Sequence, residues 1–148
     1  MDKVMQSFIL DLMDHHHYLT LATVREDGYP QATTVGYAND GLNLYFCCDK
    51  TSQKVSNINR SNKVSLTIDD EEDDWNKIKG LSMGATARVL TDAGEIRHAL
   101  DCLAARFPPM KNISEQELAG VAFVQIAPKV VSVLNYEKGF GHTDLIEV

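Results

Sequence analysis

The chain opens with a helical pattern of apolar positions and then changes to strand patterns. One apolar stripe at one-turn spacing predicts a first helix, and its members are Val4, Met5, Phe8, Ile9, Leu12 and Met13. From Tyr18 onward Thr, Leu and Val dominate, and the turn sequences Asp27-Gly28 and Asn39-Asp40-Gly41 interrupt them. The pattern therefore predicts three antiparallel strands joined by hairpins, over 18–25, 31–38 and 42–48.

The rest of the chain continues the alternation of strands and helices. The predicted elements are a helix up to Arg60, strands over 63–68 and 77–90, a helix from 91–92 to 107, a short helix over 114–118, and strands over 121–126 and 129–136. Gly80 and Gly84 inside the long strand indicate bulges or a close approach by another group. Pro128 is placed at a corner between the last two strands, and no element is predicted for the tail 137–148.

These elements predict a single domain over residues 1–148 with a mainly β (α+β) fold. Short hairpin connections exclude a doubly wound parallel sheet, because parallel strands need long crossovers. About six to seven antiparallel strands in a chain of this size favour a barrel with flanking helices.

Composition narrows the class of protein. The 148 residues are 44% hydrophobic and 24% charged, which argues against disorder. No apolar run approaches the ~20 residues that a membrane span needs, and Asp2 stands where a signal peptide would be basic. We therefore expect a cytoplasmic protein without a membrane partner. Three cysteines, two of them adjacent, fit neither a disulfide framework nor a zinc site.

The charge of the chain is local. Its formal net charge is −7, but six acids lie in the run 69–74, which leaves 15 of the 21 acidic residues against 14 basic ones. No basic stripe is present to neutralise phosphates, so nucleic acid is not an expected partner. The acidic run lacks the ligand alternation and glycine of a calcium loop, and we interpret it as a solvated loop.

The histidines give no convergent metal site. His15, His16 and His17 are neighbours in the sequence, so their side chains diverge on a strand or a helix. We interpret them as a helix end and expect no metal. His98 is predicted on the exposed face of its helix, and His142 lies in a glycine-flanked tail loop where a ligand contact is possible.

The most informative stretch is LNLYFCCDKTSQKVSNINRSN, which covers residues 42–62. It runs from a strand through a polar turn into a helix. The turn carries Lys50, Thr51, Ser52 and Lys54. Hydroxyls, backbone N–H groups at a helix start and lysine side chains together favour an anion such as phosphate. The pattern also occurs in capped helices that bind nothing.

Three segments in order resemble a known family. They are TLATVREDGYPQATTVGY, LYFCCDKTSQKVSNINRSNKVSLTI and KGLSMGATARVLTD, and the resemblance spans about residues 15–107. They resemble the pyridoxamine-phosphate-oxidase-like flavin-binding split barrels, and most of all the small general-stress-protein-like members. The resemblance implies an antiparallel split β-barrel, a homodimer, and FMN bound in the cleft between subunits. The flavin would supply the redox chemistry.

The resemblance also implies a set of cofactor-binding residues. Ser52 and Lys54 would bind the FMN phosphate, and strand two and the ends of two other strands would lie along the ring and ribityl chain. The residues implied for that second role are Gln31, Thr33, Thr34, Val35, Cys47, Cys48, Lys79 and Gly80. From the other subunit, Trp75, Phe140 and His142 would close the cleft. Read on their own, Cys47 and Cys48 are small buried apolar residues.

The chain also departs from the true oxidase. No arginine follows Arg106, so the motif that binds a phosphorylated vitamin B6 substrate is missing, and Gln53 stands where the oxidase has arginine. We therefore expect an FMN-dependent oxidoreductase acting on an unknown small molecule, with no assigned catalytic residue. The alternatives are a non-catalytic flavin-binding or stress-related protein, and a haem-binding split barrel with a histidine as axial ligand. A deazaflavin coenzyme would need more positive charge.

Overall fold

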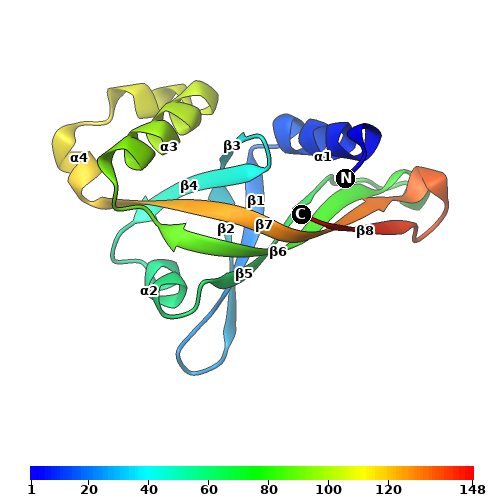
Figure 1. The fold of residues 1–148 in the computed structure, drawn as a ribbon, viewed down its shortest axis with the longest axis horizontal. Helices are drawn as coiled ribbons and strands as arrows, with labels where there is room; N and C mark the ends of the chain where they lie inside the picture. Colours follow the sequence, from blue (N-terminus) through cyan, green and yellow to red (C-terminus); the bar gives the residue numbers. More distant parts are fainter.

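A computed structural model describes all residues 1–148 of the chain. Most of the chain forms one antiparallel sheet that curls on itself, with helices at its ends and along one side (Figure 1). The strands are β1 (Tyr18–Val24), β2 (Pro30–Gly36), β3 (Ala38–Asp40), β4 (Asn43–Asp49), β5 (Lys63–Asp69), β6 (Lys79–Val89), β7 (Val121–Asn135) and β8 (Thr143–Glu147). The α-helices are α1 (Lys3–His15), α2 (Gln53–Arg60), α3 (Ala93–Arg106) and α4 (Glu115–Ala119), and the short 3-10 helices are η1 (Trp75–Lys77), η2 (Pro108–Asn112) and η3 (Tyr136–Lys138).

The sheet order forces the curl. The strands run β2-β1-β5-β6-β7-β4-β3, and β8 pairs with β7. The two edge strands, β2 and β3, are consecutive in the chain and only Tyr37 separates them. The two ends of the sheet must therefore meet, which makes the predicted split barrel. Tyr37 is fully buried at this junction, and its hydroxyl donates to the carbonyl of Met13 at 2.6 Å.

The core fills the inside of the barrel. A cluster of 21 buried residues comes from the inward positions of the strands, together with Ile9, Leu12 and Met13 of α1 and Ile58 of α2. A smaller cluster lies between α3 and the outer side of β3, β4 and β7. In Figure 1, α3 and α4 lie above β4, α1 covers the opposite upper end, and α2 lies at the lower left. None of the helices has the length and apolar character that crossing a bilayer requires.

Most predicted elements are present, with three corrections. The predicted second strand over 31–38 is two strands, because the chain changes sheet edge at Tyr37. Residues 121–136 hold one strand, β7, because Pro128 is accommodated at a register shift opposite Gly84 and Ala85. The tail has a strand, β8, which pairs with β7 over 130–134. β8 has only five residues, which is too short for its alternation to predict a strand.

The predicted irregularities in β6 have two different causes. Gly84 marks the bulge, and a Cβ there would meet nothing within 4 Å. At Gly80 a Cβ would lie 3.2 Å from the Cβ of Asp69, its neighbour on β5. The acidic run begins at that point and is exposed, as predicted for a solvated loop.

Replacing Leu66 by Ala tests the barrel core. Leu66 is 2% exposed in the large cluster, so Leu66→Ala should lower the free energy of unfolding by about 2–5 kcal/mol. Val4→Ala is the matched control, because Val4 is 81% exposed and its truncation should change stability by less than about 0.5 kcal/mol. Urea denaturation followed by circular dichroism measures both; equal losses would contradict this core.

Candidate cofactor site

The turn between β4 and α2 is built by Asp49. Its Oδ1 accepts hydrogen bonds from the backbone N–H of Thr51 at 2.8 Å and from the Thr51 hydroxyl at 2.6 Å. These hydrogen bonds hold the pKa of the Asp49 carboxyl below its usual value. The Thr51 hydroxyl is therefore committed to the turn, and Ser52 supplies the hydroxyl that remains at the start of the helix.

Ser52 precedes the first turn of α2, and its side chain does not cap the helix. It is the N-cap residue, but its side chain accepts no hydrogen bond from the first helical turn. In α1, α3 and α4 the cap residues Asp2, Asp92 and Ser114 each accept such a bond. The first N–H groups of a helix have no carbonyl partner within it. At α2 the N–H groups of Gln53 and Lys54 have no acceptor within the chain, and the Ser52 hydroxyl contacts only the thiol of Cys48. These donors can therefore face a ligand.

Lysine side chains add positive charge to this helix start. Lys54 is half-buried, Lys50 is exposed, and neither takes part in an ion pair. A half-buried ammonium without a carboxylate partner is well suited to an anionic ligand. Cys48 also reaches this point, with its Sγ 3.5 Å from the Ser52 Oγ.

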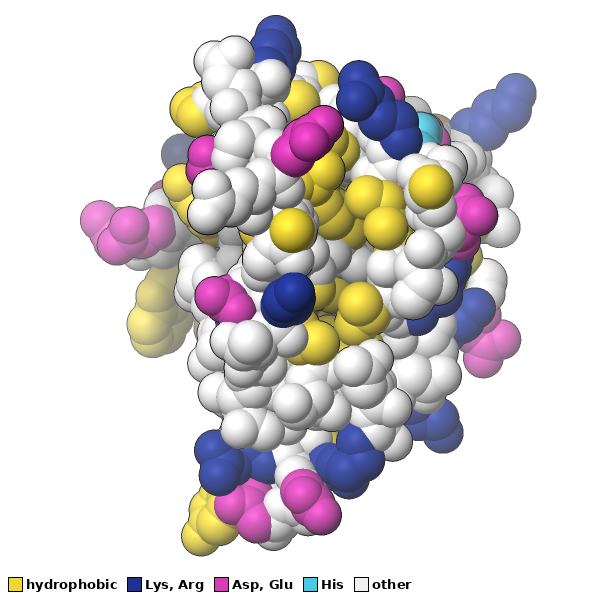
Figure 2. Space-filling model, turned by 90° about the vertical axis from the view of Figure 1, so that its left-hand side faces the viewer, with side chains coloured by type: hydrophobic (Ala, Val, Ile, Leu, Met, Phe, Trp, Pro, Cys, Tyr) yellow, Lys and Arg dark blue, Asp and Glu magenta, His cyan; other side chains and the backbone are white.

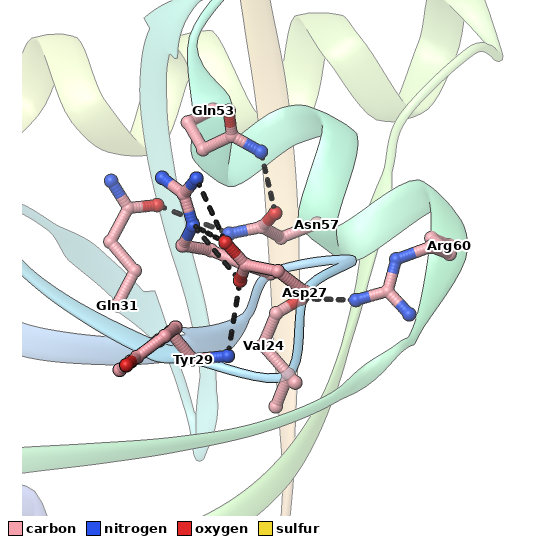
Figure 3. A network of polar contacts seen from close by, with 8 residues as sticks. Val24, Asp27, Tyr29, Gln31, Gln53, Asn57 and Arg60 are labelled. Carbon is pink, nitrogen blue, oxygen red and sulfur yellow. Dashed lines mark hydrogen bonds and ion pairs between the residues drawn. The ribbon is translucent and has the colours of Figure 1, made fainter.

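A chain of amide groups joins α2 to the β1–β2 hairpin (Figure 3). Asn57 of α2 is 1% exposed, and its Nδ2 donates to Thr23 Oγ1 at 3.0 Å and to Gln31 Oε1 at 3.1 Å. Its Oδ1 accepts from Gln53 Nε2 at 2.9 Å. Both the amino group and the oxygen of this buried amide are thus paired, and they fix Gln31 and Gln53 beside the start of α2.

The predicted residues of β2 do not share one face. Side chains alternate along a strand, so Gln31, Thr33 and Val35 point to the inner side and Thr34 to the outer side. Gln31 and Thr33 are half-buried at the end of the barrel near α2. Val35 is 8% exposed and belongs to the core cluster, so only its backbone is available to a ligand.

The two adjacent cysteines also separate. Cys48 packs against the barrel core and lies beside Ser52. Cys47 packs against the cluster under α3 on the other side of the sheet, and burial raises the pKa of its thiol. The structure therefore brings Cys48, and not the side chain of Cys47, to the predicted site.

Lys79 and Gly80 lie at the other end of β6. The N–H of Ala87 in β6 donates to the carbonyl of Asn62, just after the end of α2. Ala87 is eight positions along the strand from Lys79, which is roughly 25 Å of extended chain. Lys79 lies 3.3 Å from Glu137 and, with Gly80, lines a hollow of about 360 Å³ next to the acidic run. One copy of the chain thus places these two residues far from α2.

An exposed aromatic cluster occupies that same end of the molecule. Trp75 stacks on Phe140 with ring centroids 6.2 Å apart, and Tyr136 meets Phe140 edge-on at 5.5 Å. Trp75 and Phe140 are 66% and 70% exposed. His142 is held nearby in the tail, with its Nε2 3.0 Å from Asp144 Oδ2.

Sequence reasoning missed the residues that organise the α2 end. Asn57 and Thr23 are buried polar residues, and Arg25 and Asp27 of the hairpin lie with Gln53 around one hollow. The available signal was the polar Asn57 between the apolar Val55 and Ile58 of a short helix. No three His, Cys, Asp or Glu side chains come together as metal ligands.

Figure 2 shows the face of the molecule that carries α4 and α2 in Figure 1. Apolar side chains gather around a hollow near its middle, and charged side chains surround them. The N–H of Lys50 donates to the carbonyl of Gly120 at 3.0 Å, so the turn before α2 is fastened to the end of α4. The candidate site is therefore part of a rigid end of the barrel.

Comparisons with known proteins match this architecture. The model of the family described as pyridoxamine 5'-phosphate oxidase matches residues 2–135. No protein with a curated record matches the chain in sequence.

Solved structures share the fold at low sequence identity. A conserved hypothetical protein of Mycobacterium tuberculosis has 23% identity and a TM-score of 0.79, over 97% of this chain and 91% of that one. A Clostridium acetobutylicum protein related to general stress protein 26 has 16% identity and a TM-score of 0.75, over 100% and 97%. The haem storage protein HutZ of Vibrio cholerae has 15% identity and a TM-score of 0.68, over 84% and 89%.

Asn57→Ala tests the amide chain. It removes three hydrogen bonds and leaves the buried Thr23 hydroxyl without its partner, so the free energy of unfolding should fall by about 1–3 kcal/mol. Asn59→Ala, at an exposed position of the same helix, is the matched control. Chemical denaturation measures both variants, and an unchanged midpoint for Asn57→Ala would show that the network does not hold the hairpin to α2.

Proposed function

Because the chain belongs to the pyridoxamine 5'-phosphate oxidase family, we propose that it binds FMN and uses it to oxidise or reduce a small molecule. The observation that carries the proposal is the set of hydrogen-bond donors at the start of α2. There the Ser52 hydroxyl, which does not cap the helix, and the N–H groups of Gln53 and Lys54, which have no acceptor, lie beside the half-buried Lys54 side chain, which forms no ion pair. This donor set fits a phosphate dianion.

The residues around the start of α2 fit the parts of FMN. Ser52, Lys54 and the first N–H groups of α2 would hold the phosphate, and Gln31 and Thr33 would offer polar contacts to the ribityl chain. Cys48 gives a small apolar surface beside them. FMN, when bound, supplies hydride and electron transfer. The protein's own contribution is to bind and orient the group and to cover the ring.

The outer face of the sheet supports a homodimer. Small uncharged residues form two adjacent rows across four strands, and no helix covers them. One row is Ala32, Ala22, Ser65 and Gly84, and the other is Thr34, Thr20, Thr67 and Ser82. Small side chains without charges allow a second copy to approach this face closely. A second copy can also bring Lys79 and the Trp75–Phe140 pair to a flavin that one chain leaves open.

The chain does not support oxidation of pyridoxamine phosphate itself. No arginine follows Arg106 in the sequence, and Arg106 is committed to the fold. Its guanidinium donates to the carbonyls of Met13, Asp14 and His16 and lies over the Tyr37 ring at 4.9 Å. Arg106 is therefore not available to bind a second phosphate, on the substrate.

Two other functions remain as alternatives with their own tests. A non-catalytic flavin carrier would bind FMN and show no reduction of the bound flavin by nicotinamide donors. A haem-binding function is suggested by HutZ, whose name states haem storage. In this chain His16 has its Nδ1 against the Leu12 carbonyl and its Nε2 against Asp70, and His142 faces Asp144. As a haem ligand, His16 or His142 would have to leave these partners. Flavin is the first proposal because the donors at the start of α2 fit a phosphate.

Lys54→Gln tests the phosphate site. A hydrogen bond to a charged group contributes about 1.5–3 kcal/mol, so the variant should bind FMN roughly 10- to 100-fold more weakly. Lys111→Gln changes the net charge equally at an exposed position of η2 and should bind like the unmodified chain. Quenching of FMN fluorescence measures the affinities. Equal binding by both variants would remove the site from α2, and no binding by the unmodified chain would remove the flavin proposal.

Ser65→Arg tests the dimer. A charge in the middle of the small-residue face should prevent pairing, so the mass in light scattering should fall from about twice 16.5 kDa to that of one chain. Gln116→Arg, at an exposed position of α4, is the control. An unmodified chain that is monomeric at all concentrations would contradict the proposed interface.

A further inference from the structure

The tip of the β1–β2 hairpin points an arginine at the start of α2. Thr23 and Arg25 are two residues apart, so their side chains leave the ribbon on the same side. Thr23 faces α2, because its hydroxyl accepts from Asn57. A hollow of about 370 Å³ lies there, and its lining is entirely polar: Arg25, Glu26, Asp27 and Gln53. Arg25 thus shares a cavity with the first residue of the helix.

Arg25 forms an ion pair with Asp27 that an anionic ligand can replace. Its Nε donates to both Asp27 oxygens, at 3.2 and 3.3 Å, and its Nη2 lies 3.2 Å from Oδ2. This hydrogen bonding is the main cause that lowers the pKa of Asp27, so the pair is ionised. Both side chains are about half exposed, at 44% and 50%. Such an ion pair contributes little to stability, and a guanidinium has five donors, of which Asp27 engages two.

The hairpin is fixed in position relative to the helix. Asn57 connects the root of the hairpin to α2 through Thr23. Figure 3 shows its second bond, to Gln31, and the bond from Arg60, at the far end of the same helix, to the Val24 carbonyl. Gly28, with φ of +90°, makes the tight turn at the tip. Arg25 therefore stands on a rigid base held at both ends of α2.

The start of α2 offers a phosphate ammonium groups and no guanidinium. A phosphate monoester carries about two negative charges at neutral pH. Lys54 is the half-buried cation there and Lys50 is exposed, while Gln31 and Gln53, which Asn57 positions on either side, are neutral. Arg25 is the guanidinium that shares a hollow with Gln53, and a planar guanidinium binds phosphate oxygens in pairs.

We propose that Arg25 is the guanidinium of the phosphate site, acting beside Lys54, and reaches the ligand from the hairpin across Gln53. This proposal rests on the proposed FMN function and adds a specificity residue to it. In the ligand-free chain Asp27 holds Arg25 and neutralises it. When a phosphorylated flavin binds, its phosphate takes the place of Asp27 as an acceptor for the guanidinium. Arg25 would then select FMN over riboflavin, which has the same ring and ribityl chain and no phosphate.

Arg25→Gln tests this selection directly. Losing a charge-assisted pair should weaken FMN binding about tenfold or more and leave riboflavin binding unchanged within about twofold. Arg97→Gln is the matched control, because Arg97 is an exposed arginine of α3 paired with Asp101. This variant should bind FMN and riboflavin with the affinities of the unmodified chain. Asp27→Asn should tighten FMN binding, since it removes the competing carboxylate. Fluorescence quenching with FMN and with riboflavin gives each affinity.

The outcomes separate this inference from the flavin proposal. If the unmodified chain binds neither flavin, the flavin proposal itself fails. If it binds FMN and Arg25→Gln binds FMN equally well, the role of Arg25 is wrong while the flavin proposal stands. Equal loss of FMN and riboflavin affinity would assign Arg25 a structural role in the hairpin and also overturn the inference. Arg25→Lys, which keeps the charge and the fold, should retain part of the preference for FMN.

Discussion

The fold depends on one short segment of the chain, residues 30–40, that forms both edges of the sheet. Residues 30–36 pair with β1, and residues 38–40 pair with β4. A flat sheet cannot satisfy both pairings, because only one residue, Tyr37, separates the two strands. The Tyr37 N–H bonds to the His17 carbonyl, and its ring is covered by Arg106. This crossing point therefore fastens α1 and α3 to the closed barrel.

Closure of the barrel is also what creates the candidate site. Once the sheet curls, the β1–β2 hairpin and the turn after β4 lie at the same end, although about 25 residues separate them in the chain. The α2 helix covers this end and buries Ile58 in the common core and Asn57 against the hairpin. A buried amide is costly unless its hydrogen bonds are made. The same contacts that stabilise α2 therefore fix the polar groups at its start.

Sequence pattern predicted most of the elements and the helix start on which the candidate site is built. The alternation of apolar residues and the Asp-Gly and Asn-Asp-Gly turns predicted the hairpins, and Thr51, Ser52 and Lys54 marked the helix start. Long-range pairing decided the rest. The break at Tyr37 and the strand β8 follow from which edges meet, which local periodicity does not contain. The separation of Cys47 from Cys48 follows from the packing of α3 on one side of the sheet.

The distribution of chemistry along β6 argues for an assembly of two chains. The candidate cofactor site at the start of α2 lies beside the carboxyl end of β6. Lys79, the stacked Trp75–Phe140 pair and the acidic run lie at the amino end of β6. Large aromatic side chains that are two-thirds exposed are costly to leave in water. The uncharged face of Ala, Ser, Thr and Gly lies between the two ends. An antiparallel pairing of two such faces would place the aromatic end of each chain over the α2 end of the other, and would cover a flat ring from both sides.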